Sequence, residues 1–502
     1  MANGILDGYE FPHDVAAPFG IDYGTGLRVD VRTDTFNQHG VISGATGAGK
    51  SRDIQLLIEW LSERGVSCLL SDGKGDMSGL AKAGELDEKA QRRADRLGQD
   101  WWEETFLPVE FLALGGHGIG VPLNFTIGSF GYESIGKLAK LSEPQMRHFK
   151  TAWRAINNDS SRPTESIEDL CALVRGFKDD PDSSIGDAMA NRIIDNLENF
   201  EYDNPGLFGG PDFDIMDLIR VDDEGYGQVS IIDSTELQDN PAIVTTSILW
   251  VLDKLLKTLP EVGNKEMKMV IFIDEAHTLF EGDTPRAFVD KFRMTIKKLR
   301  SKGVGIFLCT QNLADIPDDI LSQCALRIQH VIRVNTAKQR TLAKRTAETF
   351  PDNGDYNVLK ELTAMPTGRA LVTILDEDGF MTPPACVDVF CPRTSLDPMT
   401  RDEIAEVVEK SELTRKYRRL AFEREERERN ARRAPLPFLP GRSAPSDDAD
   451  LFAALRGSVS RPERHPSADS ITDALGMDDD DIEAAEEYMN EQSERPNENI
   501  WG

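Results

Sequence analysis

The sequence predicts an α/β fold with a mainly parallel sheet, an inserted helical subdomain and a disordered acidic C-terminal tail. Short apolar segments recur along the chain, and several are followed by a helical pattern, which is typical of parallel sheets. The expected strands are residues 40–42, 66–70, 269–273, 305–309 and 328–334. Between about residues 80 and 224 the pattern is polar and mostly helical, and this stretch is too long for a loop.

These patterns divide the 502 residues into four parts. Residues 1–35 form a short N-terminal segment, and residues 36–395 form the α/β unit with its insertion. Residues 396–434 form a charged helical segment, followed by the tail at 435–502. The alternating charges of the helical segment suit a solvated helix with ion pairs between turns, and equally a contact with nucleic acid or a partner.

The tail is set apart by its charge. Residues 444–502 contain 4 Lys+Arg and 16 Asp+Glu, which gives a net charge of −12. This composition cannot bury enough apolar surface to offset the loss of chain entropy, so we expect disorder.

The net charge of −30 excludes a free-standing basic nucleic-acid binder, so any contact with DNA requires a local basic patch. The sequence has no run of 18 apolar residues and no signal-peptide pattern, and we expect no membrane association. The six cysteines are scattered without a CxxC pair, which indicates buried thiols in a cytoplasmic protein.

A glycine-rich motif of the form G-x-x-x-x-G-K-[ST] lies between an expected strand and a helical pattern. It consists of Gly44, Ala45, Thr46, Gly47, Ala48, Gly49, Lys50 and Ser51. In such a P-loop, backbone N–H groups surround phosphate oxygens at a helix N-terminus. Lys50 is expected to reach the β- and γ-phosphates of ATP, and the Ser51 hydroxyl to hold Mg²⁺.

Polar residues also follow three other expected strands. Asp274 fits the carboxylate that orders Mg²⁺, and Glu275 fits a general base that activates water. Gln311 lies where it can hydrogen-bond the γ-phosphate or the water. Ordinary strand-end turns are the alternative for these residues, and residues 72–76 fit a tight turn as well as a catalytic loop.

Together these residues resemble the HerA/FtsK-type P-loop ATPases, and within them the helicase HerA-like (YjgR-type) group. The resemblance is carried by residues 42–50, 72–76, 274–277, 300–305, 310–312, 316–319 and 347–350. It implies a RecA-like core, a hexameric ring and ATP-driven movement of double-stranded DNA through the pore.

The resemblance also implies an arginine that acts on the nucleotide of a neighbouring subunit, and Arg300 is the matching residue. Arg300 precedes the strand that leads to Gln311, so it is expected at the opposite edge of the sheet from the nucleotide. Arg293 and Arg327 are the next candidates. The alternative for Arg300 is an ion pair with a nearby acid.

Two segments could supply the basic patch. Residues 286–302 contain seven cations and one acid, with Phe288, Phe292, Ile296 and Leu299 at helical spacing. This pattern predicts an amphipathic helix with a cationic outer face. Residues 333–348 add five cations against one acid. Such faces suit phosphate contacts or a subunit interface, and also plain solvation.

Two other functions remain open. One is an ATP-regulated assembly module of a defence or mobile-element complex, which switches a partner protein docked on the acidic tail and pumps no DNA. The other is a metabolic kinase, against which Asp274, Glu275 and Gln311 argue, because a kinase excludes water.

Overall fold

The computed structural model describes residues 16–158, 166–178, 186–208, 210–262, 267–280, 286–351, 357–376 and 379–433. The chain divides into two compact units, Met1–Arg432 and Arg433–Gly502. The fold below is that of the first unit, and the expected tail at 435–502 lies outside the described residues.

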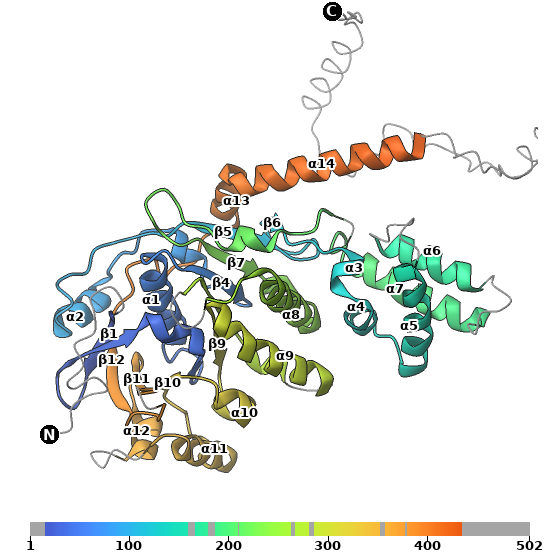
Figure 1. Cartoon of the computed structure of the whole chain (residues 1–502). Helices are drawn as coiled ribbons and strands as arrows, with labels where there is room; N and C mark the ends of the chain where they lie inside the picture. The colour runs from blue at the N-terminus through green and yellow to red at the C-terminus, as the bar shows by residue number, and fades with distance from the viewer. Residues whose placement is uncertain are drawn as a thin grey trace, which may run out of the picture. The chain divides into compact units, whose positions relative to one another are not determined.

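One sheet of twelve strands runs through the described part of the chain (Figure 1). In spatial order the strands are β2 (Arg28–Arg32), β1 (Ala16–Asp22), β12 (Ala385–Val389), β11 (Arg369–Ile374), β10 (Leu326–His330), β3 (Gly40–Ser43), β9 (Val304–Thr310), β8 (Met269–Ile273), β4 (Ser67–Asp72), β7 (Val229–Asp233), β5 (Val109–Ala113) and β6 (Val121–Pro122). All pairings from β10 to β6 are parallel, and those from β10 to β2 are antiparallel. The prediction of a mainly parallel α/β fold is confirmed.

The central strands are buried on both faces, because helices cover each side of the sheet. Along β8, Val270 and Phe272 pack with α1 (Lys50–Ser62), whereas Met269, Ile271 and Ile273 pack with α8 (Pro241–Thr258) and α9 (Arg286–Leu299). This alternation follows from the two-residue period of a strand. Shorter helices at the rims are α2 (Glu88–Arg96), α10 (Asp318–Leu321), α11 (Ala337–Glu348) and α12 (Val358–Ala364).

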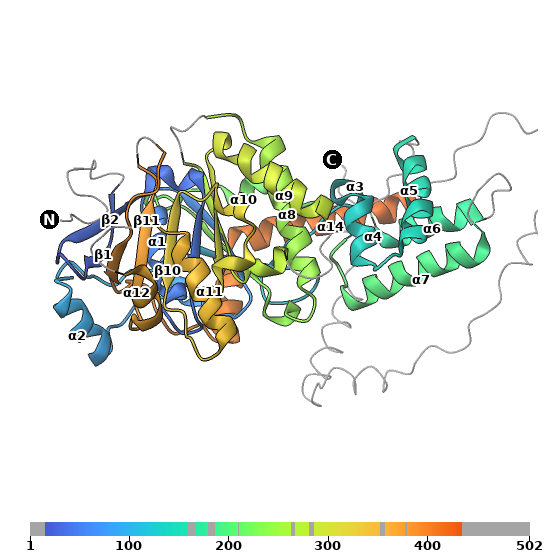
Figure 2. The same cartoon turned by 90° about the horizontal axis from the view of Figure 1, so that it is seen from below.

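The helices of the expected insertion lie between residues 127 and 203, where Figure 2 shows them side by side. They are α3 (Ile127–Phe130), α4 (Tyr132–Leu138), α5 (Glu143–Asn158), α6 (Ile167–Lys178) and α7 (Asp187–Asp203). Phe125 joins them to α8, because its ring centroid lies 4.7 Å from that of Trp250. The wider span 80–224 also contributes β5 and β6 to the sheet, so it is not helical throughout.

The charged segment after the sheet forms two helices, α13 (Arg401–Lys410) and α14 (Glu412–Arg433). The start of α14 packs on residues 213–217 of the same unit. The Tyr417 ring stacks on Phe213 with centroids 5.0 Å apart, and its hydroxyl donates to Asp217 Oδ2 at 2.8 Å.

One strand boundary differs from the sequence prediction. The strand expected at 328–334 is β10 and ends at His330, because its parallel partner β3 ends at Ser43. The next residue, Val331, turns over the glycine-rich motif and accepts a hydrogen bond from Ala45 N at 3.1 Å.

All six cysteines are buried free thiols, as predicted. Among the described helices, none combines the length and the apolar character needed to cross a membrane.

Candidate active site

The glycine-rich motif connects β3 to α1 at the carboxyl edge of the sheet. Gly44 and Gly49 have φ angles of 146° and 131°, which side-chain-bearing residues rarely adopt. Their backbones also rest on His330, since a Cβ at Gly44 would lie 2.5 Å from His330 Cβ. His330 is therefore the floor of the loop, with its Cα and Cβ under Gly44 and its ring under Gly49.

This floor is fixed from two sides. His330 Nε2 lies 2.5 Å from Asp53 Oδ2, and Nδ1 lies 3.0 Å from the carbonyl oxygen of Arg369. Both side chains of the Asp53–His330 pair are buried. Because Asp53 belongs to the first turn of α1, the pair ties that helix to β10 beneath the loop.

Lys50 and Ser51 are the first two residues of α1. Lys50 Nζ donates to the carbonyl oxygens of Gly44 at 2.7 Å and Ala45 at 3.3 Å, so the ammonium group lies on the loop. Burial lowers the pKa of Lys50, and the nearby charge of Lys74 lowers it further. Ser51 Oγ donates to Asp76 Oδ2 at 2.9 Å.

The next two strands of the sheet after β3, namely β9 and β8, bring the predicted acids and glutamine to the same edge. Asp274 and Glu275 follow β8, and Gln311 follows β9, which lies between β3 and β8. Gln311 Nε2 lies 3.5 Å from Glu275 Oε1. Glu275 has a left-handed backbone with φ of 47°, which costs on the order of 1–2 kcal/mol in a residue other than glycine.

The structure adds a residue for which the sequence left the role open. Lys74, in the loop after β4, places Nζ 2.9 Å from Asp274 Oδ2 and 2.7 Å from Glu275 Oε1. Although burial opposes both charges, the contact raises the pKa of Lys74 and lowers that of Glu275. The signal in the sequence was the position of residues 72–76 after a strand of the parallel sheet.

Asp72 shapes this loop. Its carboxylate accepts hydrogen bonds from the backbone nitrogens of Lys74, Gly75 and Met77 at 3.0, 2.7 and 3.0 Å. Burial raises the pKa of Asp72 to about 6, although these hydrogen bonds act in the opposite direction. Asp72 therefore sets the backbone of the loop, while Lys74 and Asp76 point their polar groups into the site.

Arg300 does not lie near the P-loop, Asp274 or Glu275 of its own chain. It lies in a 3₁₀ turn, Arg300–Lys302, at the amino end of β9, and its exposed guanidinium has no ion pair among the described residues. Arg293 pairs with Asp290 at 2.9 Å and also with Asp319. Arg327 is largely buried and donates to the carbonyl oxygens of Thr349 and Leu321 at 3.2 and 3.1 Å. Of the three arginines, Arg300 has the freest side chain.

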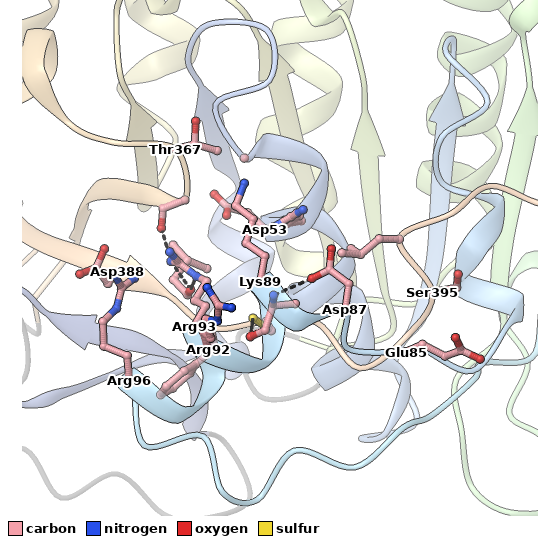
Figure 3. Close-up of a pocket in the computed structure, with 18 of the residues that line it drawn as sticks. Asp53, Glu85, Asp87, Lys89, Arg92, Arg93, Arg96, Thr367, Asp388 and Ser395 are labelled. Atoms are coloured by element: carbon pink, nitrogen blue, oxygen red, sulfur yellow. Dashed lines mark hydrogen bonds between the residues drawn. The ribbon is translucent and has the colours of Figure 1, made fainter.

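A cavity of about 970 Å³ opens beside the start of α1 (Figure 3). Arg52 from α1 and Arg92, Arg93 and Arg96 from α2 line it, opposite the entry to β11. Arg93 braces the wall, because its guanidinium donates to the carbonyl oxygens of Gly368 and Val389, both at 2.6 Å. The cavity thus extends from Gly49 of the P-loop and is lined by seven basic and five acidic side chains, with the basic ones in excess.

The family model for the helicase HerA-like C-terminal region matches residues 22–430. Two similar proteins are DNA double-strand break repair helicases HerA. That of Sulfurisphaera tokodaii is 22% identical over 355 residues, covering 70% of this chain and 65% of the relative. That of Saccharolobus solfataricus is 23% identical over 364 residues, covering 70% and 64%. The chain thus spans just under two thirds of these relatives.

Among solved structures, the bacterial conjugative coupling protein TrwB is similar with a TM-score of 0.49 and 15% identity, covering 74% of this chain and 90% of that one. VirB4 of Thermoanaerobacter pseudethanolicus is similar with a TM-score of 0.49 and 15% identity, covering 77% and 98%.

Proposed function

The chain belongs to the helicase HerA-like C-terminal family, and on this premise we propose that it is a Mg²⁺-dependent ATPase motor that acts on double-stranded DNA as a homo-hexameric ring. The observation that carries the proposal is the meeting of the P-loop, Asp274, Glu275 and Gln311 at one edge of the sheet. A phosphate-binding loop next to an acid that can activate water is what hydrolysis of a phosphate bond requires.

In this proposal the backbone of Gly44–Gly49 surrounds the phosphates, and Lys50 leaves the carbonyl oxygens of its own loop for the β- and γ-phosphates. Glu275 takes a proton from the attacking water. The water oxygen then forms a bond to the γ-phosphorus. At the same time the bond between the γ-phosphorus and the β,γ-bridging oxygen breaks, and ADP and phosphate leave. Gln311 holds the water or a γ-phosphate oxygen against Glu275.

The side chains around Ser51 fit Mg²⁺. Ser51 and Asp274 are the proposed holders, and Asp76, already bonded to Ser51 Oγ, adds a carboxylate. Hydroxyl and carboxylate oxygens are the donors that Mg²⁺ prefers, with water and phosphate completing its shell. When bound, the ion neutralises charge that develops on the phosphates.

The cationic cavity offers room for the nucleoside end of the nucleotide. It begins at Gly49 and Arg52, on the P-loop side, and extends to Val389 and Phe390. Neither Arg52 nor Arg96 has an ion pair among the described residues, so both can face a ligand.

The basic face for DNA is assigned to α9 and α11. Phe292, Ile296 and Leu299 of α9 are buried, whereas Lys291, Lys297 and Lys298 are exposed. On α11 the exposed cations are Lys338, Arg340, Lys344 and Arg345. Since phosphate contacts release counterions, binding through these faces should weaken steeply with salt.

The test is ATP hydrolysis with and without double-stranded DNA at moderate salt, together with a native mass measurement with and without nucleotide. Lys50→Ala should lose nucleotide affinity and hydrolysis together, because the P-loop loses its cation. Retained hydrolysis in Lys50→Ala would overturn the site. An active ATPase that DNA does not stimulate would instead favour the partner-switching module, for which the acidic tail is the motivating feature.

A further inference from the structure

We propose that Lys74 is a second catalytic cation, which holds Asp274 and Glu275 while no triphosphate is bound and transfers to a γ-phosphate oxygen when ATP binds. This inference rests on the proposed ATPase function. It assigns a role to the loop at residues 72–76, which the P-loop and the acid pair leave without one.

One ammonium group contacts both acids. Lys74 and the acid pair are 200 residues apart in sequence, yet Nζ lies within 2.9 Å of one oxygen of each acid. The side chain of Lys74 is 38% exposed, whereas those of Asp274 and Glu275 are 13% and 23% exposed. The two acids are therefore largely covered, while Lys74 stays partly open to solvent.

In this arrangement one oxygen of Glu275 is held and the other is buried. Its Oε1 lies 2.7 Å from Lys74 Nζ and 3.5 Å from Gln311 Nε2. Its Oε2 is buried without a hydrogen-bond partner among the described residues and lies 3.3 Å from His277 Nδ1. Release of Glu275 from Lys74 is thus a condition for activating water.

The charges show what would release it. Lys50 and Lys74 share the site with three carboxylates, those of Asp76, Asp274 and Glu275. A triphosphate adds the negative charge of its γ-phosphate next to Lys50. This charge attracts the ammonium group of Lys74 from the acids toward the phosphate. ADP lacks the γ-phosphate, so it leaves Lys74 on the acids.

The backbone of the loop can stay in place during this transfer. Asp72 accepts from three backbone nitrogens, and Gly73 O accepts from Gln238 Nε2 at 2.7 Å. Only the four-carbon side chain of Lys74 has to rotate. Lys74 would therefore distinguish ATP from ADP without a movement of the loop.

The test compares Lys74→Met and Lys74→Arg with the unchanged protein, by affinity for ADP, affinity for a non-hydrolysable ATP analogue, and ATP turnover. For Lys74→Met we expect ADP affinity within about twofold, analogue affinity lower by about tenfold or more, and turnover lower by about 10²–10³-fold. Lys74→Arg should recover part of both losses, because it keeps the charge.

Lys254→Met is the matched control. Lys254 is 30% exposed and pairs with Asp212 at 3.1 Å, outside the site, so its loss should leave all three quantities unchanged. Equal losses of ADP and analogue affinity in Lys74→Met, with a lower melting temperature, would mean that Lys74 only supports the loop, and would overturn the inference. If the unchanged protein neither binds the analogue nor hydrolyses ATP, the proposed function itself fails.

Discussion

The two edges of the sheet handle charge in opposite ways. At the carboxyl edge, Lys50, Lys74, Asp274 and Glu275 gather in one site and neutralise one another. At the amino edge, the buried side chain of His39 is satisfied by the backbone alone: Nε2 bonds the carbonyl oxygen of Ile296 at 3.0 Å, and Nδ1 accepts from Ile306 N at 3.2 Å.

This difference separates a site that awaits a ligand from a site that is already complete. In the proposed function, the carboxyl-edge charges have each other as partners only until phosphate and metal bind. At the amino edge, Arg300 is exposed and has no ion pair among the described residues. An edge of this kind is suited to serve a neighbouring molecule.

The largest effect is expected from breaking the amino edge. Arg300→Ala should lower ATP turnover in assembled rings by about 10³–10⁵-fold, because an arginine finger stabilises transition-state charge. Rings mixed from Arg300→Ala and Lys50→Ala subunits should regain partial activity, since an intact P-loop can then lie beside an intact Arg300. Arg175→Ala, which removes a half-exposed arginine of α6 outside the site and the basic faces, is the control. Full activity of Arg300→Ala rings would mean that the finger lies elsewhere.

The next effect comes from the carboxyl edge. Glu275→Gln should lower turnover by about 10²–10⁴-fold, because the proton acceptor is lost, while ATP stays bound. Measuring turnover and nucleotide affinity on the same preparation tests whether turnover is lost while ATP binding is kept. Turnover at the parent rate would show that another group is the base.

A smaller effect follows from the neutral histidine. Burial lowers the pKa of His39 to about 4, with the Ile296 carbonyl opposing and the Arg300 charge assisting. Folding thus favours the neutral form of His39. Its contribution to the free energy of unfolding is fully present above pH 6.5 and is lost as the pH falls toward 4. The loss should reach up to about 3 kcal/mol.

Urea unfolding between pH 4 and 7 measures this loss. His39→Asn is the comparison, because asparagine tolerates the φ of 64° found at this position. The variant should be less stable at pH 7 and should change less with pH. Asp72, whose pKa is raised to about 6, stabilises the protein as the pH falls, which is opposite to the effect of His39. Because Asp72 is present in both proteins, its contribution cancels when one stability curve is subtracted from the other. Parallel curves would contradict the assignment to His39.

The smallest effect is expected from the tail, which should belong to neither edge. Removal of residues 444–502 should leave the melting temperature nearly unchanged, because their composition predicts no packing. A decrease of more than a few degrees would show that the tail packs on the ATPase unit. Stronger DNA binding by the shortened protein at low salt would indicate that the tail masks a basic face.

The features that could be predicted from the sequence are those that depend on residues close together in the chain. The glycines and Lys50 lie within eight residues, and Asp274 follows a single apolar strand, so motif and periodicity sufficed. The antiparallel pairing of β1 with β12 joins residues more than 360 apart, for example Ile21 and Asp388, and no local signal specifies it. The bridge from Lys74 to the acids has the same origin, since it depends on β4 lying beside β8.

The histidine floor carries a consequence for how this protein can be altered. Gly44 lies against the backbone and Cβ of His330, and Gly49 lies against its ring. A substitution at position 330 would therefore change the support of Gly49 without removing any group of the loop itself. If the proposed function holds, nucleotide affinity can be altered by a residue that lies one layer beneath the phosphate-binding loop.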